Sequence, residues 1–495
     1  MSQDSTSLST IRNIHQWNSP ERRSSDHKQL SPIPLEIYLE IIDHVRPRDG
    51  IYISPQHAYE CMNSLRNMAL VCRYFCAQIL PCLYKVLIFC PEPKEESLGN
   101  RRDVLSRTFI PFCQDINCGE AFAESLALEI TQCDIRDWID VPSETLDTSP
   151  VKPSLDALIK ALPAMTNLAS IVLSRTTLTP TLLESILRLE KLTSLRIQCC
   201  DLAGMTTKVI HDFASRVKLQ TFHFFSNDMQ DEQSDSSAGA SEKELLSLLM
   251  NVSTFGTDSW PLISAMIASD AVPSFQTLDI FHILDPAALC DFLCRISTLT
   301  SLTLDGVAPT EDSYFLVLSN LKQLRHLSCP PCLISRLSGS QNLSTLSFYT
   351  RAHQSEDPAM LASFIKAGLN SWKAFSQFRS LQELCLPLIF MLLITVDPLY
   401  SPRDAKELKN LTVFSDGTAT ISREFIISDP IFMDGGPMDD NVKDAFFMWG
   451  LLRIIGQQKH FPKLEWFTFH GLNDRTWKWR NEGMSGKWRP FQLLE

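Results

Sequence analysis

Two cysteine pairs have the residue type and the spacing that redox or metal chemistry would need. Cys329 and Cys332 enclose the sequence CPPC, and Cys290 and Cys294 lie about one helical turn apart in CDFLC. A C-x-x-C pair can exchange disulfides or supply half of a zinc site. A zinc site also needs further ligands, and the chain has no second C-x-x-C to supply them. We therefore predict buried structural cysteines and no metal.

The other signatures of catalysis that we considered are absent from the sequence. The eleven histidines are scattered, and no HExxH, Walker phosphate loop or G-x-G-x-x-G run occurs. We predict a protein that is no enzyme, with no catalytic residue and no cofactor. An enzyme whose reacting groups meet only in space is the alternative left open.

A repeated apolar pattern, L-x-x-L-x-L, must position the residues of the long central region. Its copies begin at Leu168, Leu192, Leu219, Phe275, Leu299, Leu324, Leu343, Leu381, Leu408 and Leu464. Regular neighbours start 24 to 27 residues apart, as from 168 to 192 and from 192 to 219. The gap of 56 residues from 219 to 275 has room for one degenerate copy. Copies after Leu343 are irregularly spaced, which indicates insertions.

The copy from Leu192 to Leu202 also carries Cys200 at the position where leucine-rich repeats have Asn or Cys. The pattern resembles the leucine-rich repeat family. That resemblance implies an α/β solenoid of the horseshoe type, in which each unit is a short strand, a turn and a returning helix such as 179–189. In this register Cys329 and Cys332 both point into the core.

Residues on either side of the second apolar position of each repeat point away from the core. They form a column of Val172, Arg196, His223, Asp279, Thr303, Ser328 and Ser347, with a second column of Ser and Thr beside it. Aromatic and arginine side chains often dominate binding energy at protein interfaces. The predicted target-binding residues are Arg196, His223, Phe225, Asp279, Phe281, Tyr349 and Trp466.

The region before the repeats has two segments that are more apolar than an amphipathic surface helix. Residues 31–45 predict one helix, and residues 64–80 predict a second, which Pro81 ends before a strand-like LYKVLIF. A unit of this size cannot bury so much apolar surface by itself. A partner is therefore expected, either elsewhere in this chain, where the helices would cap the solenoid, or on another chain.

The order of these apolar residues resembles the F-box motif of fungal-type F-box proteins. The residues that carry the resemblance are Ile33, Pro34, Leu35, Ile37, Ile41, Leu70, Val71, Cys72, Phe75, Leu83 and Tyr84. The resemblance implies that these residues bind a Skp adaptor, and through it a cullin-RING ubiquitin ligase of the SCF type. The chain would then be the subunit that recognises the substrate, a protein target that the sequence does not identify. The alternative is a leucine-rich-repeat interaction scaffold with no ligase attached.

These patterns divide the chain into five parts. We expect a disordered N-terminus at 1–29, an F-box-like module at 30–90, a linker with the first solenoid strand at 91–154, and the solenoid at 155–474. An acidic insertion of low complexity at 226–243 leaves the solenoid. The aromatic and basic segment 475–495 could stack on single-stranded nucleic acid, but a C-terminal cap on the solenoid is our prediction.

Charge and hydropathy limit the partners further. The net charge of −12 argues against a protein that works by binding nucleic acid or an anionic membrane. The longest apolar run, 384–396, is shorter than the roughly 20 residues that a membrane-spanning helix needs. Because the N-terminus has no signal-like apolar core, we expect the protein in the cytoplasm, the nucleus or both.

Overall fold

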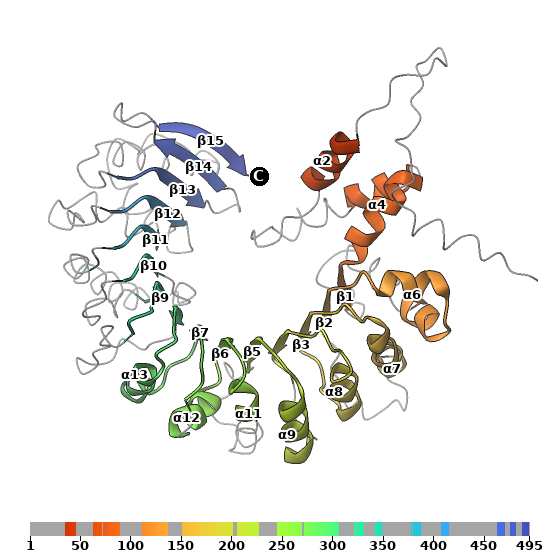
Figure 1. Cartoon of the computed structure of the whole chain (residues 1–495), viewed down its shortest axis with the longest axis horizontal. Helices are drawn as coiled ribbons and strands as arrows, with labels where there is room; N and C mark the ends of the chain where they lie inside the picture. The colour runs from red at the N-terminus through yellow and green to blue at the C-terminus, as the bar shows by residue number, and fades with distance from the viewer. Residues whose placement is uncertain are drawn as a thin grey trace, which may run out of the picture. The chain divides into compact units, whose positions relative to one another are not determined.

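The computed structural model describes residues 35–45, 63–71, 73–89, 111–136, 151–200, 205–226, 245–269, 272–305, 321–330, 342–348, 378, 380–387, 407–414, 463–470, 476–481 and 488–494. The chain forms two compact units, Met1–Leu248 and Leu249–Glu495. Figure 1 labels their helices and strands. The predicted N-terminal segment 1–29 and almost all of the acidic insertion 226–243 lie outside the described residues.

Parallel strands in chain order form the sheet of the first unit. They are β1 (Val86–Phe89), β2 (Gln132–Arg136), β3 (Ser170–Ser174), β4 (Ser194–Gln198) and β5 (Thr221–Phe225). The sheet begins with β1, in the strand-like segment LYKVLIF and before the region 91–154 in which the first solenoid strand was predicted. It begins there because β1 pairs along its whole length with β2, which makes it a solenoid strand.

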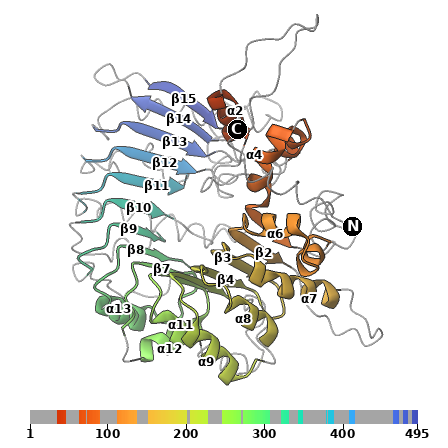
Figure 2. The same cartoon turned by 45° about the vertical axis from the view of Figure 1, so that its right-hand side comes forward.

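Helices lie along one face of this sheet (Figure 2). They are α6 (Ala121–Ala127), α7 (Val151–Ala161), which runs into the short helix η2 (Leu162–Ala164), α8 (Pro180–Ile186) and α9 (Thr207–Arg216). Helix α8 lies within the predicted returning segment 179–189. It begins where the side chain of Thr179 accepts a hydrogen bond from the Leu182 amide at 3.2 Å.

The second unit continues the same repeat. Its parallel strands are β6 (Thr254–Thr257), β7 (Thr277–Ile280), β8 (Ser301–Leu304), β9 (His326–Cys329), β10 (Thr345–Phe348), β11 (Glu383–Pro387), β12 (Asn410–Phe414) and β13 (Trp466–His470). The helices described here are α12 (Trp260–Ala268) and α13 (Pro286–Arg295), and α11 (Leu246–Leu249) spans the boundary between the units. Side chains of Ser259 and Asp285 cap α12 and α13.

Two antiparallel strands end the sheet, β14 (Thr476–Asn481) and β15 (Trp488–Leu494). Together they form the segment predicted to be a cap. Trp479 is 4 % exposed and stacks on Phe467 of β13, with ring centroids 5.4 Å apart. Because side chains alternate along a strand, Lys478 and Arg480 point to the opposite face of the sheet from Trp479.

The core of each unit confirms the predicted repeat solenoid. In all ten predicted copies of the pattern, the three apolar side chains are at most 4 % exposed. The structure also supplies the degenerate copy between 219 and 275, since Val252, Phe255 and Thr257 of the β6 repeat are buried in the same positions. An earlier copy, Ile130, Cys133 and Ile135, is buried at β2.

In two repeats of the first unit, a polar residue near the turn after the strand bonds to the preceding repeat. Cys200 donates its thiol hydrogen to the carbonyl of Leu173 in the preceding repeat, at 3.4 Å. Thr176, at the equivalent position of the preceding copy, donates its hydroxyl to the carbonyl of Ile135, also at 3.4 Å. Thr176 is 1 % exposed. This inward position, predicted from Cys200, is therefore confirmed.

The N-terminal module consists of α2 (Leu35–Val45), a helical segment at 63–69 and α4 (Arg73–Tyr84). Ile42, Leu65 and Ile79 form its core, and Tyr38 meets Phe75 edge to face at 5.5 Å. The predicted single helix over 64–80 is wrong. A turn at Leu70 and Val71 divides it, and these two amides bond to carbonyls three residues back.

The prediction that Pro81 ends the second helix is also wrong, because α4 continues to Tyr84. A proline inside a helix removes one hydrogen bond and costs about 3 kcal/mol. Contacts on both sides of it offset that loss. Ile79 is fully buried in the module core and Leu83 packs against the same core, while Tyr84 contacts Phe112 with ring centroids 5.2 Å apart.

Candidate functional site

The face of the sheet opposite the buried repeat positions, here called the open face, carries the predicted column of side chains. In the first unit, strand register aligns Asp134, Val172, Arg196 and His223. In the second unit it aligns Asp279, Thr303, Ser328 and Ser347. The same column continues through Cys385, Thr412, Thr468 and Lys478. The alignment follows from the repeat, because each strand pairs with the next without a shift.

Three predicted target-binding residues of the first unit lie together. The Arg196 guanidinium carbon is 4.8 Å from the centre of the Phe225 ring, and His223 meets the same ring edge to face at 6.0 Å. The expectation that Phe225 is exposed is wrong, since the ring is 8 % exposed. Arg196 itself is exposed, so it is the group of this cluster that a partner would meet first.

The remaining predicted target-binding residues are spread over the second unit. Asp279 and Phe281 are half-buried near the same end of β7, and Trp466 is half-buried on β13. Tyr349 lies outside the described residues. The structure therefore groups Arg196, His223 and Phe225 in one unit, and places Trp466 beside residues that the sequence prediction did not include.

Those residues line a pocket of about 450 Å³ on the open face between β10 and β14. Its lining comes from five successive strands: Thr345, Glu383, Leu384, Cys385, Asn410, Thr412, Trp466, Thr468 and Lys478. Pockets of 300 to 1,000 Å³ are the usual size for ligand sites in proteins. The sequence contained a signal for part of this pocket, because Thr412 and Thr468 occupy the same repeat position as Arg196. Lys478 belongs to no repeat, so its place required the pairing of β14 with β13.

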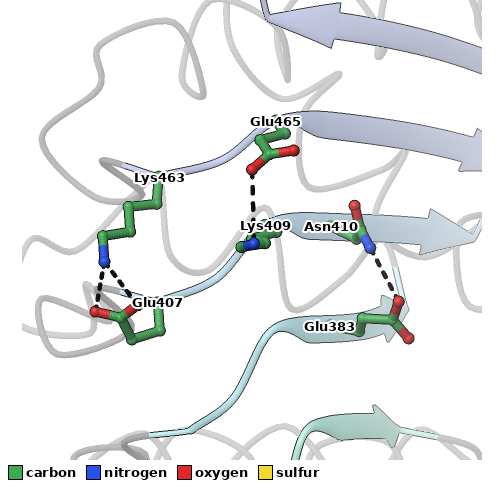
Figure 3. Close-up of polar contacts among 6 residues, drawn as sticks. All are labelled: Glu383, Glu407, Lys409, Asn410, Lys463 and Glu465. Atoms are coloured by element: carbon green, nitrogen blue, oxygen red, sulfur yellow. Dashed lines mark hydrogen bonds and ion pairs between the residues drawn. The ribbon is translucent and has the colours of Figure 1, made fainter.

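Opposite charges stand at the two ends of this pocket. At the β11 end, the Glu383 carboxylate accepts a hydrogen bond from Thr345 at 3.1 Å and a second one from Asn410 at 2.9 Å, and Figure 3 shows the second. At the β14 end, the Lys478 ammonium lies 4.7 Å and the Arg480 guanidinium carbon 5.3 Å from the centre of the Trp466 ring. Among the described residues no carboxylate forms an ion pair with either cation.

The thiol on the pocket wall has little nucleophilic character. Burial raises the pKa of Cys385, and a hydrogen bond with Ser347 opposes that rise only in part. The neutral thiol is therefore the stable form near neutral pH, and a neutral thiol is a weak nucleophile. The chemistry that the pocket offers is hydrogen bonding and charge pairing.

A separate apolar surface lies on the N-terminal module. Leu70 is 79 % exposed and Val71 is 70 % exposed, on the turn between the two helical pieces. On α2, Ile37 and Ile41 are each 43 % exposed and lie on one side of the helix, while Leu39 is 44 % exposed on another. We call these five residues the apolar surface of the module. Four of them, all except Leu39, were predicted to bind an adaptor.

Other predicted adaptor-binding residues serve contacts within the chain. Phe75 and Leu83 pack against the core of the module. Tyr84 contacts Phe112, and its burial raises the pKa of its hydroxyl while Arg66 nearby lowers it. Of Leu35 only the backbone is described, and Ile33, Pro34 and Cys72 lie outside the described residues.

The described cysteines of the two pairs are buried or half-buried. Cys329 is fully buried at the third apolar position of its repeat, as predicted, whereas Cys332 lies outside the described residues. Cys290 and Cys294 are half-buried free thiols on α13, and burial raises the pKa of Cys290 to about 11. In the part of the chain that the structure describes, no three His, Cys, Asp or Glu side chains gather as metal ligands would. No helix among those residues is long and apolar enough to cross a membrane.

Comparison with known proteins leaves the function open. No protein-family model matches the chain, and no curated protein matches it. Among solved structures, it is similar to a chain of the yeast Rad7 and Elc1 complex at 16% identity, over 78% of this chain and 94% of that one, with a TM-score of 0.32. It is also similar to an internalin of Listeria monocytogenes at 12% identity, over 61% of this chain and 87% of that one, with a TM-score of 0.24. At these TM-scores neither likeness assigns a function to this chain.

Proposed function

We propose that this chain is the substrate-recognition subunit of an SCF-type cullin-RING ubiquitin ligase. The N-terminal module would bind a Skp adaptor, and the open face of the repeats would bind the target protein. The ligase would supply the chemistry, and this chain would contribute proximity by holding the target close to it. The proposal assigns no catalytic residue and no cofactor to the chain.

The observation that carries the proposal is the exposed apolar surface of the module. The sequence resemblance to the F-box predicts that Ile37, Ile41, Leu70 and Val71 bind an adaptor, and all four are exposed although each is apolar. Ile37 and Ile41 lie on one side of α2, and Leu70 and Val71 are adjacent in the turn, and groups of exposed apolar side chains are typical of surfaces that bind another protein. Leu70 and Val71 together leave the largest fraction of their surface for a partner to cover.

A second candidate is an interaction scaffold in which the module only caps the solenoid. A specific observation favours it, since Tyr84 of α4 packs on Phe112 and β1 follows directly from α4 into the sheet. The module is thus part of the first unit whether or not it binds an adaptor. The two functions differ in what covers Leu70 and Val71.

The experiment measures binding of the full chain to a purified Skp adaptor by interferometry. Full burial of a large aliphatic side chain is worth about 1.5 to 3 kcal/mol. With 79 % and 70 % of their surfaces exposed, Leu70 and Val71 could together contribute about 2 to 4 kcal/mol. Leu70→Ser with Val71→Ser should therefore weaken adaptor binding by about 30-fold or more.

The matched control changes two exposed apolar residues of the second unit. Leu284 is 63 % exposed and Val272 is 41 % exposed, and Leu284→Ser with Val272→Ser should leave adaptor binding unchanged. Thermal midpoints of all variants should agree, because the changed side chains contribute little to the core. If the wild-type chain fails to bind the adaptor, or both double variants bind it equally well, the ligase assignment is wrong and the scaffold remains.

A further inference from the structure

The pocket between β10 and β14 joins two columns of the open face. One column runs through Thr345, Glu383, Asn410, Trp466 and Arg480, and the other through Ser347, Cys385, Thr412, Thr468 and Lys478. These strands are neighbours in one sheet, so the polar groups repeat at each strand spacing of about 4.8 Å. The arrangement is a row of hydrogen-bonding side chains that crosses the strands.

The charges at the ends of this row have a defined separation. Glu383 on β11 and Lys478 on β14 are three strand spacings apart, about 14 Å, and two residues apart along the strand direction, so their backbones are about 16 Å apart. Charged residues nearby pair with each other, as Lys463 does with Glu407 at 2.7 Å and Lys409 with Glu465 at 3.9 Å (Figure 3). Within the described residues Glu383 and Lys478 form no such pair: Glu383 accepts hydrogen bonds from the neutral Thr345 and Asn410, and Lys478 lies over the ring of Trp466.

We propose that this pocket binds an extended segment of a partner protein that carries an acidic and a basic side chain four residues apart. An extended chain rises about 3.3 Å per residue, so four residues span about 13 Å, and the length of the charged side chains covers the remaining few ångströms between the two sites. Residues i and i+4 of an extended segment also point to the same side. The acidic side chain of the partner faces Lys478, and the basic one faces Glu383.

The groups between the two ends suit a peptide backbone. The hydroxyls of Thr412 and Thr468 line the pocket and can each donate or accept a hydrogen bond. The half-buried Trp466 offers a flat apolar surface beside them. The inference deepens the target-binding half of the proposed function and does not depend on adaptor binding.

The test starts from a displayed library of random decapeptides selected on the immobilised full-length chain. Enriched peptides should share an acidic and a basic residue four positions apart. The best of them, resynthesised with a fluorophore, is then the probe in anisotropy titrations. Binding should weaken as NaCl is raised from about 50 mM to 500 mM, because Glu383 is exposed and Lys478 is only half-buried, so salt screens both charges.

A charge reversal gives the decisive comparison. Glu383→Lys with Lys478→Glu keeps the net charge of the chain. It should lower the affinity for the probe peptide by at least about tenfold, because two attractions become repulsions. A peptide with its acidic and basic residues exchanged should bind this variant at least about tenfold more tightly than it binds the wild type. The control, Glu407→Lys with Lys463→Glu, reverses an ion pair outside the pocket and should change neither affinity.

Each contrary outcome is informative. The inference would be overturned if the enriched peptides lacked the spaced charges or if the library yielded no binder. It would also be overturned if the charge-reversed variant bound the probe as the control variant does. Adaptor binding measured on the same preparations separates this result from the ligase proposal. If peptide binding fails while the adaptor still binds, only the pocket is refuted, and the opposite result refutes only the ligase assignment.

Discussion

Substitution of Phe255 tests whether β6 is a repeat of the solenoid, which the spacing of the sequence alone left as a gap. Phe255 is fully buried, and its ring stacks on that of Phe275 at 5.5 Å with 22° between the planes. Truncation of a buried phenylalanine to alanine typically costs about 3 to 5 kcal/mol. We therefore expect Phe255→Ala to destabilise β6 and β7 by an amount within that range.

Amide hydrogen exchange of the full chain is the suitable assay, because a chain of two compact units need not unfold in one step. A loss of 3 to 5 kcal/mol corresponds to exchange faster by about 150- to 4,000-fold in peptides that cover β6 and β7. Thr254→Ala is the control, since Thr254 is half-buried in the same strand and paired with Thr277. It should change the exchange rate by less than about tenfold. Equal exchange in the two variants would refute the repeat at β6 and leave an insertion between β5 and β7.

Two further predictions concern the cysteines. Cys329→Ala with Cys332→Ala should lower the thermal midpoint modestly, because Cys329 fills a fully buried position. The metal content of the protein should stay unchanged. Stoichiometric zinc that disappears in this variant would contradict a structural role. Burial raises the pKa of Cys200 to about 11, so its thiolate is scarce below that pH. At pH 8 iodoacetamide should therefore alkylate Cys200 far more slowly than the exposed Cys118. The rate of labelling of Cys200 should rise as the pH approaches 11. Mass spectrometry of the labelled peptides measures both rates, and similar rates at pH 8 would show that Cys200 is not buried.

The prediction of the repeats from the sequence succeeded because their period is local. An apolar residue at a fixed position of a short strand points to the same side in every copy, so Leu195, Leu302 and Leu411 could be assigned to the core without a structure. The same period placed Arg196 and His223 side by side on the open face. The inward position of Cys200 was predictable for the same reason.

Other features depend on contacts between residues distant in sequence. The copy at β6 was hidden because Thr257 replaces an apolar residue, and only its pairing with β7 reveals it. Helix α4 continues through Pro81 because tertiary packing on both sides exceeds the local preference of proline. Arg196 lies over the ring of Phe225 because the pairing of β4 with β5 brings the two residues together.

The sequence by itself determined that this chain is a repeat solenoid with an apolar N-terminal module, because each of those statements rests on patterns within about 30 residues. Only the tertiary structure decided which apolar residues of the module remain exposed, since exposure depends on what the rest of the chain covers. It also decided the pocket, in which Glu383 and Lys478 are 95 residues apart in sequence but only three strands apart in the sheet. No local pattern fixes that distance, because it arises from the parallel stacking of β11, β12 and β13 and the antiparallel pairing of β14 with β13.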